Sequence, residues 1–224
     1  MQVNQQQDVN EFNCLLCDLL EDRMKGTEVQ GTTKDLFDGR LRSSVKCINV
    51  NFESTTYEPF STLLLSVKGN KSIEDSLREY VAPEDMVGAD QYDGGDHGKQ
   101  DARKVVGFQE LPPVLQVSLN RFGIDMKELK ATKDNSRLEF GEVLDLESVL
   151  PKGAVQSSQS QRNRFSQGQD EKVVNRYHLH SILIHRGTAD SGHYYAFIRP
   201  NIDDQWFEFN DHRVTPVTKH FAFT

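Results

Sequence analysis

The sequence predicts an α+β protein with one leading helix and a largely antiparallel sheet region. Apolar residues recur at helical spacing over residues 8–26, whereas they alternate with polar residues through much of the remaining chain. The second half also lacks the strand–helix alternation that a doubly wound parallel sheet requires. With 224 residues, the chain fits one domain, with or without subdomains.

The leading helix is predicted from the stretch DVNEFNCLLCDLLEDRMKG. Its apolar face carries Val9, Phe12, Leu16, Leu19 and Leu20. Asp8 stands at the N-cap position with Glu11 three residues later, as in a capping box, and Gly26 ends the helix. This is the best-defined element in the sequence.

The middle of the chain predicts mostly strands. Residues 36–69 alternate apolar and polar side chains and break at Gly39 and Gly69, which is typical of an antiparallel sheet. A short helix with Ser72 as its N-cap is expected in SIEDSLREYV. A polar, turn-rich loop follows at GADQYDGGDHGKQDARK, and PPVLQVSLNRFG predicts a further strand.

The last third combines an insertion with a sheet. Residues 152–172 are rich in Ser, Gln, Arg and Gly, and we expect them to form a mobile surface insertion. After it, RYHLHSILIHRG, GHYYAFIRP and QWFEFNDHRV predict three strands of a meander.

Composition excludes several classes of function. The net charge of -8 argues against a general nucleic-acid binder, which needs a basic surface to neutralise phosphates. No apolar run is long enough to span a membrane. Three cysteines without disulfide-framework spacing predict a reducing compartment, cytoplasmic or nuclear.

One histidine suggests catalytic chemistry. His193 opens an apolar strand, and Asn210 ends the next strand seventeen residues later. Two adjacent antiparallel strands would place the imidazole beside the carboxamide, whose oxygen fixes the ring and leaves its other nitrogen for a nucleophile. This is the logic of Cys-His-Asn thiol proteases. The alternative is a strand-edge histidine that is hydrogen-bonded only to the backbone.

Several separate stretches resemble the signature of the ubiquitin-specific proteases, a deubiquitinase family with a papain-like core. They occur in family order: QQDVNEF, LPPVLQVSLNRF, RLEFGEVLDL, YHLHSILIHRGTADSGHYYAFIR and WFEFNDHRVTPV. Two more, QYDGGDHGKQDARK and DRMKGTEVQGTTKDLFDGRL, resemble segments of the herpesvirus-associated branch of the family. Together they cover nearly the whole chain.

The resemblance implies a papain-like fold of fingers and palm with the thumb mostly absent. Residues 1–39 would be a remnant of the helical thumb, 40–109 the fingers, and 110–224 the palm with its His and Asn boxes. It also implies hydrolysis of the isopeptide or peptide bond after the C-terminal glycine of ubiquitin. The expected partners are ubiquitin and ubiquitinated proteins, with no nucleic acid and no membrane.

The resemblance also implies roles for individual residues. His193 would be the general base, Asn210 would orient it, and Asp211 would assist through a water. Asp8 and Gln7 belong to the Gln-Gln-Asp box, whose aspartate would meet an arginine of the ubiquitin tail.

Two loops and two neighbours of His193 complete the implied site. Gly192 and Tyr194 would contact substrate beside His193. Residues 186–192 and 127–137 correspond to loops over the ubiquitin tail, and small residues suit mobile gates.

The cysteines depart from the family pattern. The family's nucleophile sits in an Asn-x-x-Cys box well before the Gln-Gln-Asp box, and this sequence has no such box. Cys14 and Cys17 lie inside the leading helix, where we expect buried, inert thiols. Many family members bind zinc through two Cys-x-x-Cys pairs, but Cys47 has no partner cysteine in its strand. We therefore expect no metal and no cofactor.

Two explanations fit the missing box: a truncated enzyme, or a short protein that keeps ubiquitin-binding surfaces without turnover. In either case we expect the chain alone to be inactive, with an exposed apolar face that favours self-association. An adaptor that binds ubiquitin and has no enzymatic parent is the alternative from a different functional class.

Overall fold

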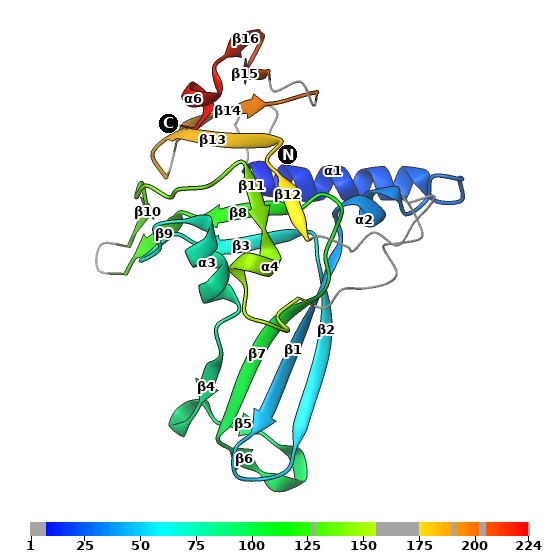
Figure 1. Cartoon of the computed structure of the whole chain (residues 1–224), viewed down its shortest axis with the longest axis vertical. Helices are drawn as coiled ribbons and strands as arrows, with labels where there is room; N and C mark the ends of the chain where they lie inside the picture. The colour runs from blue at the N-terminus through cyan, green and yellow to red at the C-terminus, as the bar shows by residue number, and fades with distance from the viewer. Residues whose placement is uncertain (1–7, 127–128, 156–174, 190, 202–204, 224) are drawn as a thin grey trace.

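The computed structural model describes residues 8–126, 129–155, 175–189, 191–201 and 205–223. The molecule is elongated and has three layers along its long axis (Figure 1). A long arm of strands lies at the bottom, a central layer combines helices with strands, and a four-stranded sheet lies at the top. The predicted α+β class is confirmed.

Two helices open the chain. The helix α1 spans Val9–Met24, and the Asp8 carboxylate caps it by accepting hydrogen bonds from the backbone amides of Asn10 (2.9 Å) and Glu11 (3.1 Å). The Glu21 side chain accepts a bond from the Thr33 amide at 3.0 Å and so ties α1 to the short helix α2, Thr32–Phe37. The leading helix is confirmed, although no residue of α1 is buried.

The arm is an antiparallel sheet in the order β2-β1-β7-β4. Its strands are β1 (Gly39–Cys47), β2 (Glu53–Phe60), β4 (Glu84–Met86) and β7 (Ala102–Glu110). A small hairpin of β5 (Tyr92–Asp93) and β6 (Lys99–Gln100) lies at the tip. There the ring of Phe52 packs against Tyr92 and His97, with centroids 6.4 and 6.0 Å apart.

The central layer corrects one prediction. The strand β3 (Thr62–Ser66) pairs in parallel with β8 (Gln116–Asn120), so antiparallel pairing is wrong for residues 62–66. The segment between them includes α3 (Ile73–Tyr80), with Ser72 as its predicted N-cap, and it is long enough for the crossover that parallel strands require. Leu63 and Leu65 of β3 are fully buried.

The apolar core of the described residues is divided into two separate clusters. The larger lies between β3, α3, β7 and the short helix α4 (Leu146–Val149), and its fully buried members include Leu63, Leu65, Leu77 and Leu146. The smaller lies under the upper sheet and contains Phe197, Trp206 and Ala222. The upper sheet therefore has a core of its own.

Two further pairs of antiparallel strands complete the sheets. One pairs β9 (Phe122–Asp125) with β10 (Lys130–Lys133), and the other pairs β11 (Val143–Asp145) with β12 (Arg176–His178). Most of the insertion expected at residues 152–172 lies outside the described residues. Its first part differs from the expectation, because Ala154 accepts a hydrogen bond from the Phe108 amide at 2.6 Å and packs against the larger core.

The upper sheet has the order β13-β14-β15-β16 and is antiparallel throughout. Its strands are β13 (Ser181–Gly187), β14 (Gly192–Ile198), β15 (Trp206–Asn210) and β16 (Arg213–Val217), followed by the helix α6 (Lys219–Ala222). The predicted meander is confirmed for β13, β14 and β15, and it has a fourth strand. The start of the first predicted strand is wrong, because residues 176–178 form β12 and pair with β11 in a separate sheet.

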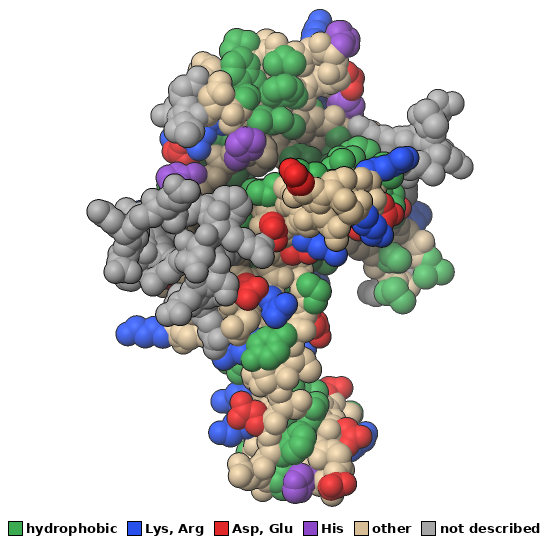
Figure 2. All heavy atoms as spheres, turned by 90° about the vertical axis from the view of Figure 1, so that its right-hand side faces the viewer, with side chains coloured by type: hydrophobic (Ala, Val, Ile, Leu, Met, Phe, Trp, Pro, Cys, Tyr) green, Lys and Arg blue, Asp and Glu red, His purple; other side chains and the backbone are tan. Residues whose placement is uncertain are grey.

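The surface differs between top and bottom. Figure 2 shows hydrophobic side chains gathered on the upper part of the molecule, while acidic, basic and hydrophobic side chains are mixed on the lower arm. Exposed large hydrophobic residues of the upper part include Leu183, Val214 and Phe221. Within the described ranges, no helix has both the length and the apolarity needed to cross a membrane.

The division into thumb, fingers and palm at residues 39 and 109 stays a prediction. The arm corresponds to the long antiparallel part of residues 40–109, whereas β3 and α3 of the same range pack in the central layer.

Candidate active site

The structure brings His193 and Asn210 together. Nε2 of His193 lies 2.7 Å from Oδ1 of Asn210, so the predicted proximity is confirmed. The register pairs Ala196 with Phe209, which places Asn210 opposite Tyr195. Because alternate residues of a strand share a face, His193 lies diagonally across from Asn210 on the same side of the sheet.

A neighbouring carboxylate was not predicted from the sequence. Nδ2 of Asn210 donates a hydrogen bond to Oε1 of Glu208 at 3.0 Å. Glu208 stands two residues before Asn210 in β15, and this period-2 spacing was the signal that could have identified it.

Asp211 lies next to this pair but outside hydrogen-bond range. Its Oδ2 is 4.0 Å from Nε2 of His193, and 72% of its side chain is exposed. Asp211 begins the two-residue turn between β15 and β16 and has a φ of +51°, a left-handed conformation that aspartate tolerates. Its assistance through a water stays a prediction.

The His193 ring opens onto a pocket of about 180 Å³. The pocket is lined by Arg186, His193, Tyr195, Phe197, Glu208, Asn210 and Phe221. The His193 side chain is 41% exposed, so a reacting group can approach it. No cysteine lines this pocket.

The three thiols lie elsewhere. Cys47 is buried, Cys17 is partly buried and Cys14 is exposed, so the expectation of a buried thiol at Cys14 is wrong. The cause is that Cys14 lies on the side of α1 that the described residues leave exposed. Burial raises the pKa of the Cys17 thiol, helped by the neighbouring Cys14, and this disfavours the reactive thiolate.

Asp8 and Tyr194 meet on the other side of β14. The Tyr194 hydroxyl donates to Oδ2 of Asp8 at 3.5 Å, although the two residues lie in different layers. Burial raises the pKa of Tyr194, and the Asp8 charge adds to it. Gln7 lies outside the described residues.

Gly192 packs directly against a histidine ring. A Cβ built at this position would lie 2.0 Å from Nε2 of His185 and 2.7 Å from the carbonyl oxygen of Arg186. No side chain fits there without displacing the ring. The glycine thus allows the start of β14 to approach His185.

His185 and Lys133 were not predicted as site residues. Nζ of Lys133 donates to the carbonyl oxygens of His185 (2.8 Å) and Gly187 (3.2 Å). Both carbonyl groups belong to β13, an edge strand of the upper sheet. They point to the same side because His185 and Gly187 are two residues apart in the strand. One ammonium group therefore joins the β9–β10 hairpin to the segment that leads to His193.

The His185 ring is held by aromatic neighbours. It contacts Phe122 and Tyr194 with centroids 5.4 and 4.7 Å apart, and its Nδ1 is buried without a hydrogen-bond partner among the described residues. Loss of hydration lowers the pKa of His185, the Lys133 charge lowers it further, and Asp8 opposes both.

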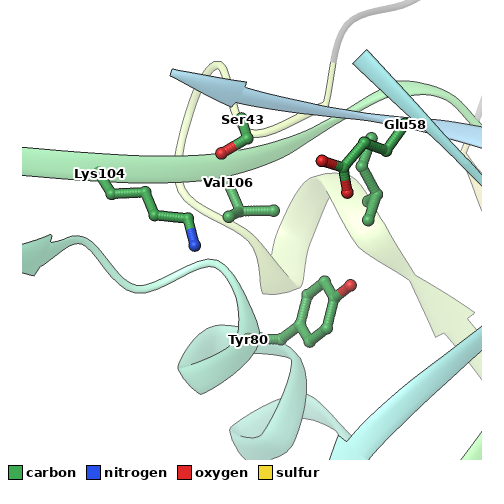
Figure 3. A pocket seen from close by; sticks show the side chains of 6 residues that line it. Ser43, Glu58, Tyr80, Lys104 and Val106 are labelled. Atoms are coloured by element: carbon green, nitrogen blue, oxygen red, sulfur yellow. The ribbon is translucent and has the colours of Figure 1, made fainter. Parts of the chain in front are cut away.

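A larger pocket lies between the arm and α3. It measures about 300 Å³ and is lined by Leu41, Ser43, Glu58, Tyr80, Lys104 and Val106 (Figure 3). Figure 3 shows Glu58 and Lys104 at opposite ends of it. It contains no paired nucleophile and base, so the chemistry favours the smaller pocket at His193 despite its size.

No group of three or more metal-ligating side chains occurs in the part of the chain that the structure describes. Of the potential ligands on the arm, Cys47 is buried in β1, and the His97 ring packs on Phe52.

Comparison with known proteins identifies the family. The model of the family described as ubiquitin carboxyl-terminal hydrolase matches residues 1–223. The chain belongs to this family. The resemblance to ubiquitin-specific proteases is thereby confirmed at the level of the family, while the closer resemblance to the herpesvirus-associated branch stays a prediction.

Individual relatives agree. The chain is 40% identical to Ubiquitin carboxyl-terminal hydrolase 15 of Saccharomyces cerevisiae over 218 residues, which are 97% of the chain and 17% of that protein. It is 45% identical to Ubiquitin C-terminal hydrolase 12 of Arabidopsis thaliana over 210 residues, 94% of the chain and 18% of the relative. The chain thus spans less than a fifth of the length of these curated relatives.

Proposed function

We propose that this chain forms the histidine- and asparagine-bearing part of a thiol-dependent ubiquitin hydrolase. The observation that carries the proposal is the 2.7 Å contact between Nε2 of His193 and Oδ1 of Asn210 at the edge of an open pocket. This arrangement holds one ring nitrogen and leaves Nδ1 for a proton transfer. The family match supports ubiquitin as the substrate.

The reaction would proceed in two steps. Nδ1 of His193 accepts the proton of a cysteine thiol, and the thiolate attacks the carbonyl carbon after the last glycine of ubiquitin. The imidazolium returns its proton to the leaving amine, which leaves a thioester. Water, deprotonated by the same ring, then hydrolyses the thioester and releases the ubiquitin carboxylate and the thiol.

The thiol would come from outside the pocket at His193. None of Cys14, Cys17 and Cys47 lines this pocket, and the family's Asn-x-x-Cys box is not in the sequence. The 224 residues alone are therefore proposed to be inactive, because removing the nucleophile of a catalytic triad lowers kcat by about 10⁶.

Asp8 is proposed to bind the ubiquitin tail. Its carboxylate caps α1 through Oδ1, and its Oδ2 faces Tyr194, so one oxygen is directed away from the helix. An arginine of the tail would pair with this carboxylate, and losing such a partner costs about 2–5 kcal/mol of affinity when the pair is buried.

A second function is worth testing because no cysteine lines the pocket. The chain would then bind ubiquitin without turnover, as an adaptor. Both functions need the Asp8 carboxylate to bind the ubiquitin tail, but only the enzyme needs His193 to transfer a proton.

A chimera separates the two. The S. cerevisiae relative would carry this chain in place of its matching segment, and release of a fluorophore from the ubiquitin C-terminus would be measured. We expect hydrolysis, and His193→Gln should lower it by about 10⁶. The matched control is His97→Gln at the tip of the arm, which should retain activity. An inactive chimera that still binds ubiquitin would favour the adaptor.

Calorimetry tests the binding surface in the 224-residue chain itself. Asp8→Asn should weaken ubiquitin binding by about 2–5 kcal/mol, yet it should leave stability within about 0.5 kcal/mol because asparagine caps helices as well as aspartate does. Asp18→Asn on the same helix serves as the control and should bind like the wild type. If the wild-type chain shows no affinity for ubiquitin, both proposed functions fail.

A further inference from the structure

Glu208 is the acidic residue in contact with the Asn210 carboxamide. Its Oε1 accepts the 3.0 Å hydrogen bond from Nδ2 of Asn210, while the other end of that amide faces His193 at 2.7 Å. Glu208 makes no other side-chain hydrogen bond or ion pair with the described residues. All three side chains line the same pocket.

A carboxamide has two different ends. Oδ1 accepts hydrogen bonds and Nδ2 donates them, whereas an ionised carboxylate only accepts. If the Asn210 amide were turned over, its oxygen would face the Glu208 oxygen and repel it. The Glu208 carboxylate therefore determines which end of the amide reaches His193.

The orientation of the amide in turn sets the protonation of the ring. Because Oδ1 of Asn210 can only accept, Nε2 of His193 must carry the hydrogen. Asp211, whose oxygen lies 4.0 Å from the same nitrogen, favours the same form. Nδ1 then keeps its lone pair.

We propose that Glu208 is a positioning residue, which holds the Asn210 amide so that neutral His193 is protonated on Nε2 and accepts protons at Nδ1. The inference rests on the proposed function, in which this ring is the general base. The requirement is specific to asparagine: an aspartate at position 210 would offer two accepting oxygens and would need no partner to orient it.

The test reverses the polarity at position 208. In the ¹⁵N-labelled 224-residue chain, two-bond ¹⁵N–¹H spectra distinguish a protonated ring nitrogen from an unprotonated one, and His193→Gln assigns the signals. Wild-type protein should show the proton on Nε2 at a pH where the ring is neutral. Glu208→Lys presents a donor, so the amide should turn over and the major form should become protonated on Nδ1.

Asn210→Asp supplies the control background. There, Glu208→Lys should leave the proton on Nε2, because one carboxylate oxygen can accept from the lysine and the other from the ring. A merely structural role for Glu208 would affect both backgrounds alike. Backbone amide shifts of β13–β16 confirm that the sheet is intact in each variant.

Glu208→Gln gives a milder second test, because glutamine both donates and accepts. It should raise the fraction of Nδ1-protonated ring above the wild-type level. The proposal is overturned if Glu208→Lys leaves Nε2 protonated beside Asn210, or if it moves the proton equally in the Asn210→Asp background. These spectra need neither ubiquitin nor a nucleophile, so a failure of the proposed hydrolase activity would be seen separately in the chimera.

Discussion

Gly192 shows how one residue type is required next to the candidate base. A Cβ at this position would lie 2.0 Å from Nε2 of the His185 ring. The glycine therefore combines two tasks: it starts β14 and it leaves room for an aromatic cluster that also contains Tyr194.

Gly192→Ala should destabilise the protein by about 1–3 kcal/mol, because the added methyl group must displace a packed ring. Urea unfolding followed by circular dichroism measures this. Gly123→Ala is the matched control, since a Cβ there would meet only Oγ1 of Thr132 at 3.5 Å, and its effect should stay within about 0.5 kcal/mol. Equal stability of the two variants would contradict the contact with His185.

His185 gives the stability a dependence on pH. Its pKa is lowered in the folded protein by loss of hydration and by Lys133, and Asp8 acts in the opposite direction. The folded state therefore binds fewer protons than the unfolded chain below the ordinary histidine value of about 6.5. This contribution is fully present above that value and is lost as the pH falls through it towards the lowered pKa.

We expect His185→Gln to flatten the dependence of stability on pH between about 7 and 5, because glutamine does not titrate. Urea unfolding at both pH values provides the measurement. A titration of His185 by NMR with a midpoint above about 6.5 would contradict the expected direction.

The sequence pattern predicted only some residues of the candidate active site. His193 and Asn210 could be found because each ends or begins a strand at a spacing that a single hairpin brings together. Glu208 was missed although its two-residue spacing from Asn210 in β15 was a local signal. Lys133 and His185 were missed because their contacts are made by a distant hairpin and by ring packing. Such contacts depend on the tertiary arrangement, which local pattern does not specify.

At the scale of elements, the β9–β10 hairpin supports the segment before His193. The Lys133 ammonium bridges two carbonyl groups on the free edge of β13, and Phe122 packs on His185 from the same hairpin. The two loops that the family resemblance assigns to the ubiquitin tail are thus connected to each other.

Lys133→Met should loosen this connection. Two backbone carbonyls lose a charged donor, so the Thr188 amide, which bonds to Ser191 at 2.8 Å, should exchange its hydrogen about fivefold or more faster. Lys104→Met on the arm is the control for loss of a lysine charge and should leave Thr188 unchanged. An unaltered exchange rate in Lys133→Met would show that the bridge is dispensable.

Helices and strands were predicted best where the pattern of apolar residues was clear. The helix α1 has a capping aspartate and a long apolar stripe, and β13–β15 are short runs rich in aliphatic and aromatic residues, so both were found. The direction of β3 was not, because alternation reports which face of a strand is buried and says nothing about its neighbour's direction. The short helices α2 and α4 have too few turns to produce a recognisable period.

At the scale of the whole molecule, α1 presents an uncovered apolar face. Five of its large residues are between 39% and 54% exposed: Phe12, Leu15, Leu16, Leu19 and Leu20. A helix normally buries such a stripe, so contact with another apolar surface would be favourable.

We expect the 224-residue chain to self-associate, with a sedimentation coefficient that rises with protein concentration. Leu16→Glu combined with Leu19→Glu should abolish the rise, because burying the added carboxylates is costly. Leu183→Glu, an exposed position of the upper sheet, is the control and should still associate. A single monomeric species at high concentration in the wild type would refute the prediction.

The parallel contact between β3 and β8 bears on how the chain acquires its structure. Residues 62–66 must find residues 116–120, and the intervening segment contributes α3, the arm strands β4 and β7, and the β5–β6 hairpin. Closing so large a loop is entropically unfavourable until the buried leucines of β3 compensate for it. Folding should therefore be slow. During synthesis, this parallel pair cannot form until residues 116–120 have left the ribosome.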